Sequence, residues 1–445
     1  MLLTIAITAA LIFLALSGMP IFAVIAATAL IGFYLSDIEV TVVAIELYRI
    51  VDTPMLVALP LFTLAGYLLA ESNASQRLVR TAQAAIGWLP GGLGVIALVT
   101  CAFFTAFTGA SGVTIVAIGA LLYPALVKVG FSDKFSLGLV TSSGSLGLLL
   151  APSLPLILYG IVAQQSGLGE PFSIQDLFIA GLLPAALMVV LLSLWAVWQQ
   201  RDQWHQRQRF TAAELGAALW EARWELPLPF VVFGGIYAGW LAVSETAAVV
   251  ALYVLIVEVL LYKDIKVSAL SDVFRKGMIM AGSIILILGV ALALTNIIVD
   301  AEIPARLFEF VQQHVDSKYT FLILLNIFLL LLGAVLDIFS ALVIMVPLIL
   351  PLAVGYGIHP VHLGIIFLAN MQIGYMTPPV GMNLFIASYR FKKPITELYS
   401  ASLPFMVILL VALMLITYWP WLSLRFLQID LGRGRALTPN PPQVR

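Results

Sequence analysis

Long apolar runs alternate with short polar stretches along most of the chain. An α-helix needs about 20 apolar residues to cross a bilayer. Seven runs are long enough to be simple crossing helices, at residues 3–34, 55–71, 176–198, 226–242, 245–262, 278–299 and 402–427. The first run contains Gly18-Met19-Pro20, which is expected to kink it or divide it in two. The pattern predicts an all-α, polytopic membrane protein.

Four further apolar stretches are interrupted near their middle by small and polar residues. They lie at residues 93–127, 133–161, 319–355 and 362–389. Lipid cannot solvate the backbone N–H and C=O groups that such interruptions leave unpaired, so protein or a wet cavity must cover them. Length alone leaves open whether each stretch is a re-entrant hairpin or a discontinuous crossing helix.

The positions of Lys and Arg favour one assignment, because short cytoplasmic loops are enriched in basic residues. If 93–127 and 319–355 are hairpins and 133–161 and 362–389 are full crossings, most of the 22 basic residues fall on one side. The N-terminus then lies inside the cell, and one hairpin enters from each face. Loop 199–225 is expected to form an amphipathic helix on the cytoplasmic surface. The basic tail from Arg425 onward falls outside, against the rule.

An internal repeat supports the same topology. A shift of 227 positions aligns Gly and Pro residues of the two halves: Pro124 with Pro351, Gly130 with Gly357, Gly147 with Gly374, and Pro152 with Pro379. Each hairpin also follows a more polar stretch, 72–92 or 300–318. Two copies inserted in opposite directions are typical of secondary transporters.

The composition agrees with this interpretation and excludes several other classes of protein. Of the 445 residues, 62% are hydrophobic and 10% are charged, whereas a soluble globular chain is about half apolar and a quarter charged. A soluble enzyme, a nucleic-acid-binding protein and a disordered chain are therefore excluded. A single cysteine precludes an internal disulfide, and without a P-loop motif this chain is not expected to hydrolyse ATP.

The interruptions carry the residues best suited to binding an ion and a substrate. Half-helix N-termini favour a carboxylate, and carbonyl groups of unwound backbone favour a hard cation such as Na⁺. We expect a carboxylate site built from polar side chains at the breaks: Ser142, Ser143, Ser145, Asp337, Asn370, Gln372 and Asn383. The competing interpretation is that small residues there only allow helices to pack closely.

Three acidic residues within apolar segments have two interpretations each. An intramembrane carboxylate is costly, which makes Asp337 a candidate for direct function. The alternative is that Asp337 caps the half-helix that begins near Ile338. Glu245 and Glu258 lie nearer segment ends, where a helix cap or a polar contact between scaffold helices would account for them.

An intramembrane serine protease is the enzyme hypothesis to be weighed. Gly109-Ala110-Ser111-Gly112 resembles the nucleophile motif of rhomboid proteases. That chemistry needs a histidine within hydrogen-bond reach of the serine, and the predicted topology places no histidine at mid-membrane depth. The chain is therefore not expected to be an enzyme.

The two repeat regions resemble the large membrane (M) subunit, or DctM-like permease, of tripartite ATP-independent periplasmic (TRAP) transporters, the C4-dicarboxylate family. The resemblance spans about residues 15–425. The motifs that carry it are 18–21, 59–66, 103–112, 147–155, Asp337 with Pro347 and Pro351, 357–364 and 370–385.

This resemblance implies a Na⁺-driven elevator transporter with no further cofactor. A periplasmic substrate-binding (P-type) protein would deliver an organic acid, such as a dicarboxylate or sugar acid, and a small four-helix membrane (Q-type) subunit would pair with the chain. One Na⁺ would be held by Thr108, Ser111, Gly147, Leu150 and Pro152. A second would be held, mostly through backbone carbonyls, by Gly333, Gly374, Thr377 and Val380.

The expected architecture is an inverted-repeat, elevator-type transporter with two re-entrant helical hairpins and two discontinuous helices. Residues 93–161 and 319–392 would form a mobile transport domain. Residues 1–92 and 162–318 would form the scaffold with its two arms, and 393–445 a C-terminal helix and tail. The chain is expected in the bacterial inner membrane, in contact with lipid and with no nucleic-acid partner. The alternative is a stand-alone elevator carrier, a divalent-anion/Na⁺ symporter or a Na⁺/H⁺ antiporter, that needs no binding protein.

Overall fold

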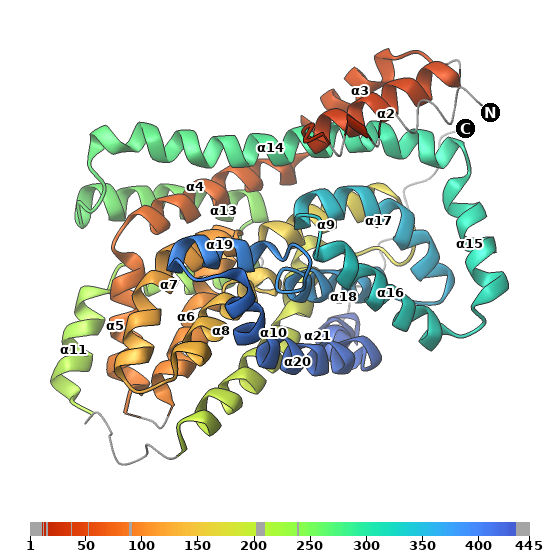
Figure 1. The fold of residues 1–445 in the computed structure, drawn as a ribbon. Helices are drawn as coiled ribbons and strands as arrows, with labels where there is room; N and C mark the ends of the chain where they lie inside the picture. The colour runs from red at the N-terminus through yellow and green to blue at the C-terminus, as the bar shows by residue number, and fades with distance from the viewer. Residues whose placement is uncertain are drawn as a thin grey trace.

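The computed structural model of the chain describes residues 11–432, apart from 12, 15–16, 37, 52, 89–90, 202–209 and 238–239. Every regular element within these residues is a helix, as the apolar runs predict (Figure 1). The start of the first run, part of loop 199–225 and the tail beyond 432 lie outside the described residues.

The helices lie close to the predicted segments. In the first half they are α2 (Ile21–Leu35), α3 (Thr41–Val51), η1 (Pro54–Val57), α4 (Ala58–Glu71), α5 (Ala74–Ile86), α6 (Gly92–Thr108), α7 (Ser111–Lys128), α8 (Asp133–Ser143), η2 (Leu146–Leu149), α9 (Leu154–Gln165) and α10 (Ile174–Gln199). In the second half they are α11 (Ala212–Glu221), α12 (Pro227–Tyr237), α13 (Val243–Leu255), η4 (Ile256–Leu261), α14 (Val267–Asp300), α15 (Ile303–His314), α16 (Lys318–Gly333), α17 (Ile338–Gly355), α18 (Pro360–Gly374), α19 (Met382–Phe391), α20 (Ile395–Tyr418) and α21 (Trp421–Gly432).

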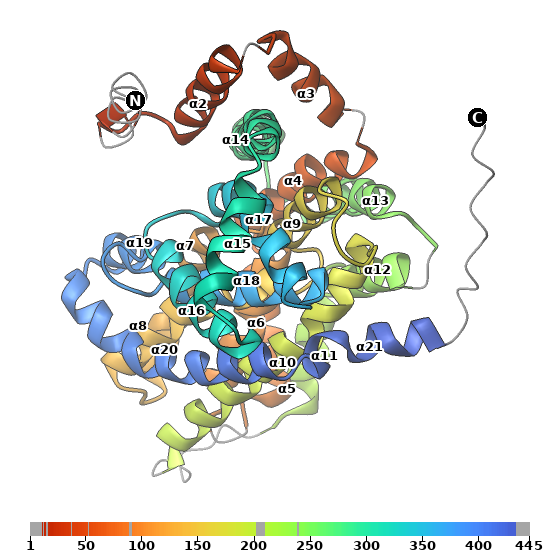
Figure 2. The ribbon, with the colours of Figure 1, turned by 90° about the vertical axis from the view of Figure 1, so that its right-hand side faces the viewer.

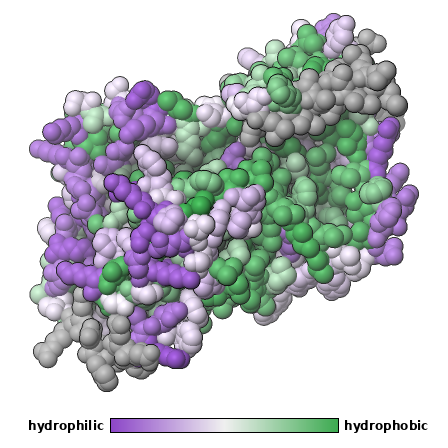
Figure 3. Space-filling view, viewed as in Figure 1, coloured by the Kyte–Doolittle hydropathy of each residue, from purple (hydrophilic) through white to green (hydrophobic). Residues whose placement is uncertain are grey.

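The molecule has two polar ends with an apolar band between them (Figure 3). Helix α14 runs from end to end, with α4 beside it and α13 beside α4, while α5 and α11 lie across one end and α15 across the other (Figure 1). The chain bends by 72° between α4 and α5 and by 118° between α15 and α16. Figure 2, which looks along α14, shows α2 and α3 on its outer side. Six of the described helices are long and apolar enough to cross a membrane, or nine when each bent pair is counted as one span.

Both predicted hairpins and both predicted broken helices are present. Helices α6 and α7 fold back on each other beside α5 at one end, and α16 and α17 lie beside α15 at the other (Figure 1). The chain between α8 and α9 is bent by 41°, and that between α18 and α19 is unwound over residues 375–381. Both breaks contain a cis X-Pro bond, at Ala151-Pro152 and Pro378-Pro379. The inverted-repeat fold class is therefore confirmed.

Local sequence explains where the hairpins and breaks occur. Gly109 joins the two arms of the first hairpin with φ +63°, a conformation that L side chains rarely adopt. Ser153 caps α9 by accepting a hydrogen bond from the Leu156 N–H. Asp337 caps α17 in the same way, by accepting hydrogen bonds from the Phe339 and Ser340 N–H groups at 3.0 Å each.

The two repeats pack on each other reciprocally. Helix α7 of the first hairpin contacts α19 of the second broken helix, and α17 of the second hairpin contacts α9 of the first. Within each repeat, a glycine of the break lies against the first arm of its own hairpin. Gly147 lies against the backbone of Ala106, and Gly374 lies against Gly333. These two pairs occupy equivalent positions under the shift of 227 residues.

Three element boundaries differ from the predicted ones. Helix α14 has 34 residues and extends into the polar segment before residue 278. The last run is divided into α20 and α21 around Pro420, which has no N–H to continue α20. Helix α12 is shorter than run 226–242. The first run is divided at Gly18, as predicted, because Gly18 has φ +85° and α2 begins only after Pro20.

The packing of α10 on the first break gives a test of this fold. A Cβ added at Gly181 would lie 1.9 Å from the Leu149 carbonyl oxygen, whereas one at Gly282 on α14 would meet open space. Overpacking a filled interior costs about 1–3 kcal/mol. We expect Gly181→Ala to lower the melting midpoint of the detergent-purified protein by a few degrees and Gly282→Ala to leave it unchanged. Equal midpoints for the two variants would contradict this packing.

Candidate functional site

A cavity of about 650 Å³ lies where the two hairpin tips meet. The first hairpin contributes residues 109–113, and the second contributes residues 337–339. Leu148 of the first break, together with Tyr375 and Met382 of the second broken helix, completes this side. The opposite wall comes from α4 and α14. The cavity therefore joins both repeats to helices that belong to neither.

Three helices point their N-termini at this cavity. Helices α7, α17 and α19 begin at Ser111, Ile338 and Met382, and all three residues line it. The N-termini of α7 and α19 have no side-chain cap. Because a helix N-terminus carries partial positive charge and exposes N–H donors, this arrangement favours an anion. No Lys or Arg is found among the lining residues.

Asp337 lies where it could serve both of the roles expected for it. Its carboxylate caps α17, so the cap interpretation is confirmed. Asp337 also lines the cavity, which keeps direct contact with a ligand as a prediction. The Tyr375 hydroxyl lies next to this cap and accepts a hydrogen bond from the Ile338 N–H at 2.6 Å.

Ser111 and Asn383 connect the two repeats at the edge of the cavity. The Ser111 hydroxyl donates to Asn383 Oδ1 at 2.7 Å, and Asn383 Nδ2 lies 3.5 Å from the Thr141 carbonyl oxygen. Asn383 is fully buried, whereas Ser111 lines the cavity. One amide therefore holds together the first hairpin, α8 and α19.

The other polar residues expected to bind substrate lie in the interior of α8 and α18 or at their ends. They are fully buried and do not line the cavity: Ser142, Ser143, Ser145, Asn370 and Gln372. The Ser145 hydroxyl lies 3.4 Å from the Gln372 carbonyl oxygen, and these positions are equivalent in the two repeats. Asn370 Nδ2 donates to Asn326 Oδ1 of α16 at 2.7 Å. Substrate contact by these five residues stays a prediction.

Of the residues expected to form the first ion site, two lie at the first hairpin tip and three in the first break. Thr108 ends α6 and Ser111 begins α7, while the Leu150 N–H donates to the Gly147 carbonyl in the adjacent break. Pro152 lies two residues further along that break. Their role as Na⁺ ligands stays a prediction.

Sequence reasoning missed Thr105, which ties this tip to the break. Its hydroxyl lies 2.9 Å from the Gly144 carbonyl oxygen and 2.7 Å from the Thr114 hydroxyl. The signal available in the sequence was its spacing of three residues from Thr108, which places both on one side of α6.

The residues expected to form the second ion site are brought together less completely. Gly333 and Gly374 are in backbone contact, and the Gly381 N–H donates to the Ala334 carbonyl at 3.2 Å. The Thr377 hydroxyl, in the break, is bonded to the Ile373 carbonyl near the end of α18. Val380 is exposed. Na⁺ binding here also stays a prediction.

The far wall of the cavity was not anticipated. It includes Tyr67 and Glu71 of α4 and Met280 of α14. The Tyr67 hydroxyl lies 3.6 Å from Met280 Sδ, and Lys276 Nζ lies 2.7 Å from Glu71. Tyr67 and Glu71 are four residues apart at the polar end of a predicted crossing helix, so their shared face could be read from the sequence. The sequence does not indicate that this face lies opposite the hairpins.

The two other acidic residues have structural partners. Glu245 Oε2 accepts a hydrogen bond from the Ala242 N–H at the start of α13, which confirms the helix-cap interpretation. Glu258 contacts Arg77 of α5, which is a polar contact between helices outside the hairpins and the broken helices.

Comparisons with known proteins agree with this architecture. A family model described as the DctM component of the tripartite ATP-independent periplasmic transporter matches residues 5–422. The large permease DctM of a C4-dicarboxylate TRAP transporter from Rhodobacter capsulatus is 35% identical over 432 residues, covering 93% of this chain and 96% of that protein. The isethionate TRAP permease DctMQ from Oleidesulfovibrio alaskensis is 32% identical over 378 residues, covering 84% of this chain and 58% of that protein.

A more distant relative and a solved structure extend the comparison. The ectoine/5-hydroxyectoine large permease UehC of Ruegeria pomeroyi is 28% identical over 417 residues, covering 93% of this chain and 96% of that protein. The crystal structure of the Alcanivorax borkumensis YdaH transporter has the same fold, with a TM-score of 0.60 at 14% identity, covering 86% of this chain and 85% of that one. The match over nearly the whole chain, on a fold with two hairpins and two broken helices, places the protein in the DctM family of TRAP transporter large permeases, multi-pass proteins of the bacterial inner membrane.

Proposed function

We propose that this chain is the large membrane subunit of a TRAP transporter that takes up an organic acid, coupled to Na⁺, by an elevator mechanism. The observation that carries the proposal is the convergence of three half-helix N-termini on one cavity, two of which, those of α7 and α19, have no side-chain cap. Backbone N–H groups and helix dipoles bind an acidic group without a basic side chain, and the cavity has the volume of a small-molecule site.

The named substrates of the relatives support recognition of an acid group. They are C4-dicarboxylates, isethionate and ectoines, and each of these molecules carries a carboxylate or a sulfonate. Their remaining parts differ widely in size and polarity. A site built from helix N-termini fits this pattern, because it recognises the oxyanion and leaves the rest of the molecule unspecified. The particular acid would then be selected by the periplasmic binding protein.

Na⁺ coupling is supported by the chemistry of the breaks beside the hairpin tips. Unwound backbone offers carbonyl oxygens, and the Thr105 hydroxyl lies 2.9 Å from the Gly144 carbonyl oxygen of the first break, while Thr108 and Ser111 lie at the hairpin tip. Oxygen ligands of this kind suit a hard cation. The absent side chains of Gly147 and Gly374 allow each break to approach its hairpin. Na⁺ bound there would supply positive charge next to the cavity and order both tips for the acid.

Packing supports a division into a moving body and a fixed body. Helix α10 contacts α6, η2 and α18, and α20 contacts α8, α18 and α19. We therefore assign α10 and α20 to the moving body with the hairpins and broken helices, which extends the transport domain expected from the sequence. Helices α2, α3, α4, α13 and α14 form the fixed body. The cavity lies between the two, and movement of one past the other would carry its contents across the membrane.

Two protein partners complete the proposed assembly. The isethionate permease DctMQ extends well beyond the region that this chain matches, which supports a separate small membrane subunit here. The periplasmic partner is a binding protein that delivers the acid. We expect uptake by proteoliposomes to require both partners, and co-expression to yield a complex with the small subunit. Full uptake by the chain alone would favour a stand-alone carrier.

Ser111→Ala tests the link between the hairpin tip and the ion. Removing the hydroxyl leaves the buried Asn383 Oδ1 without this donor, and such a loss costs about 1–3 kcal/mol. We expect the Na⁺ concentration for half-maximal uptake to rise about tenfold, which corresponds to about 1.4 kcal/mol. Ser283→Ala is the control, because that exposed hydroxyl on α14 bonds only to its own helix. An unchanged Na⁺ dependence, or undiminished uptake without Na⁺, would refute the ion assignment.

Asp337 substitutions separate capping from charge. Asparagine is as good an N-cap as aspartate, whereas alanine costs about 1 kcal/mol. If Asp337 acts only as a cap, Asp337→Asn keeps both the melting midpoint and uptake, and Asp337→Ala lowers both. We expect this outcome because the negative charge of Asp337 would repel the negative charge of a bound acid rather than attract it. Loss of uptake in a stable Asp337→Asn protein would instead show that the charge is needed.

A further inference from the structure

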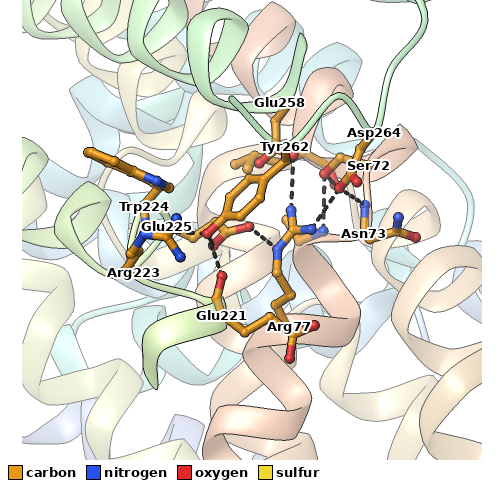
Figure 4. A network of polar contacts seen from close by, with 12 residues as sticks. Ser72, Asn73, Arg77, Glu221, Arg223, Trp224, Glu225, Glu258, Tyr262 and Asp264 are labelled. Carbon is orange, nitrogen blue, oxygen red and sulfur yellow. Dashed lines mark hydrogen bonds and ion pairs between the residues drawn. The ribbon is translucent and has the colours of Figure 1, made fainter. Parts of the chain in front are cut away.

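Arg77 forms the centre of a polar cluster at the end of the molecule that carries α5. Its guanidinium contacts three carboxylates from three separate segments: Glu225 before α12, Glu258 in η4, and Asp264 before α14 (Figure 4). Arg77 Nη2 lies 3.0 Å from Glu258 Oε2, and Nη1 lies 2.8 Å from Asp264 Oδ2. The cluster thus joins α5, the scaffold arm that precedes the first hairpin, to α12, α13 and α14.

This cluster is shielded from water. The side chains of Glu225 and Glu258 are 0% exposed, that of Arg77 is 7% exposed and that of Asp264 is 12% exposed. The ring of Tyr262 covers the guanidinium, with its centroid 3.9 Å from Arg77 Cζ. Interactions among these charges are therefore only weakly screened.

One guanidinium faces three carboxyl groups, so full ionisation would leave two uncompensated negative charges in a buried place. The nearest other cations have different partners or positions. Arg80 pairs with Glu214 and Glu221 on the exposed side of α5, and Arg223 stacks on Trp220 and Trp224. Lys263 and Lys266, in the loop between η4 and α14, are exposed. A buried charge without a partner is strongly unfavourable, so the cluster favours uptake of a proton.

The three carboxyl groups differ in their hydrogen bonds. Asp264 accepts from the Asn73 N–H as well as from Arg77; burial alone would raise the pKa of Asp264, but these hydrogen bonds bring it below its usual range. Glu225 accepts from Arg77 on one oxygen and lies 3.2 Å from the Tyr262 hydroxyl on the other. Burial raises the pKa of Glu225, and Arg77 opposes that rise. Asp264 thus has two donors suited to its ionised form, and Glu225 has Arg77 together with a Tyr262 hydroxyl that it shares with the Glu221 carbonyl.

Glu258 is the exception. Its Oε2 accepts from Arg77, but its fully buried Oε1 has no hydrogen-bond partner. Ser72 lies beside Glu258 (Figure 4), yet its hydroxyl hydrogen is directed to the Leu69 carbonyl at 3.0 Å. The Ser72 oxygen also accepts a hydrogen bond from the Ala74 N–H at 3.1 Å, so Ser72 supplies no donor to Glu258. An ionised Oε1 would therefore be a buried, charged oxygen without a donor.

We propose that Glu258 binds a proton at neutral pH, and that this proton-binding site fastens the arm α5 to α13 and α14. Protonation lowers the negative charge of the cluster by one unit and removes charge from the carboxyl group whose Oε1 has no donor. Loss of the proton at alkaline pH restores the buried charge and opposes attachment of the arm. Since α5 leads directly into α6, the site also fixes the base of the first hairpin.

Isosteric glutamine substitutions test the site in the full-length chain purified in detergent. Glutamine has the shape and the neutral charge of a protonated glutamate and keeps an oxygen for Arg77, but it cannot release a proton. Because the folded protein holds a proton that the unfolded chain releases, stability of the unsubstituted protein falls as pH rises above neutrality. We expect Glu258→Gln to keep the melting midpoint at pH 7 and to reduce its fall between pH 7 and pH 9.

Glu225→Gln is the matched control within the same cluster. It removes an ionised partner of Arg77, so we expect it to lower the midpoint at pH 7 by several degrees. The infrared spectrum of the unsubstituted protein should also contain the carbonyl band of a protonated carboxylic acid, and Glu258→Gln should remove it. A drop at pH 7 for Glu258→Gln as large as that for Glu225→Gln, or an unchanged carboxylic acid band, would overturn the proposal.

Discussion

Unpaired backbone groups within a bilayer must be covered by protein, and this constraint organises the molecule. Among the described helices, α6, α8, α16 and α18 end at a hairpin tip or a break, and these ends lie against other segments of the same fold. Gly147 and Gly374 bring each break against its own hairpin, and α7 and α17 each lie against the broken helix of the opposite repeat. The breaks are stable only as a set, so the cavity between their tips is a consequence of how they cover one another.

Much of this architecture could be predicted from the sequence because its signals are local. Glycine, proline and polar residues within an apolar run mark a break, and basic residues in short loops orient the hairpins. The cap formed by Asp337 was one of two interpretations that its position before Ile338 allowed. Ser145, Asn370 and Gln372 show the limit of such reasoning. Their type indicated a polar site, but the direction of each side chain depends on the rotation of its helix, which the sequence does not specify.

The far wall of the cavity and the Arg77 cluster depend on long-range packing instead. Tyr67 and Met280 meet although 213 positions separate them. In the sequence, Arg77 does not differ from the other basic residues of the cytoplasmic loops, and Glu258 does not differ from an acidic residue near a helix end. Neither residue indicates its partner, because contacts between α5 and η4 arise only once the arm has turned by 72° at the end of α4.

The contact between Ser145 and Gln372 has a consequence for the symmetry of the two halves. In an assembly of two identical copies, equivalent positions that touch would place the same residue against itself. Here a small hydroxyl meets a main-chain carbonyl, and the partner side chain points elsewhere, with Gln372 Nε2 lying 3.6 Å from Met188 Sδ of α10. The fold keeps its pseudo-twofold arrangement without requiring matched side chains on the axis. Side chains at this contact can therefore differ between the two halves while the shared backbone arrangement is kept.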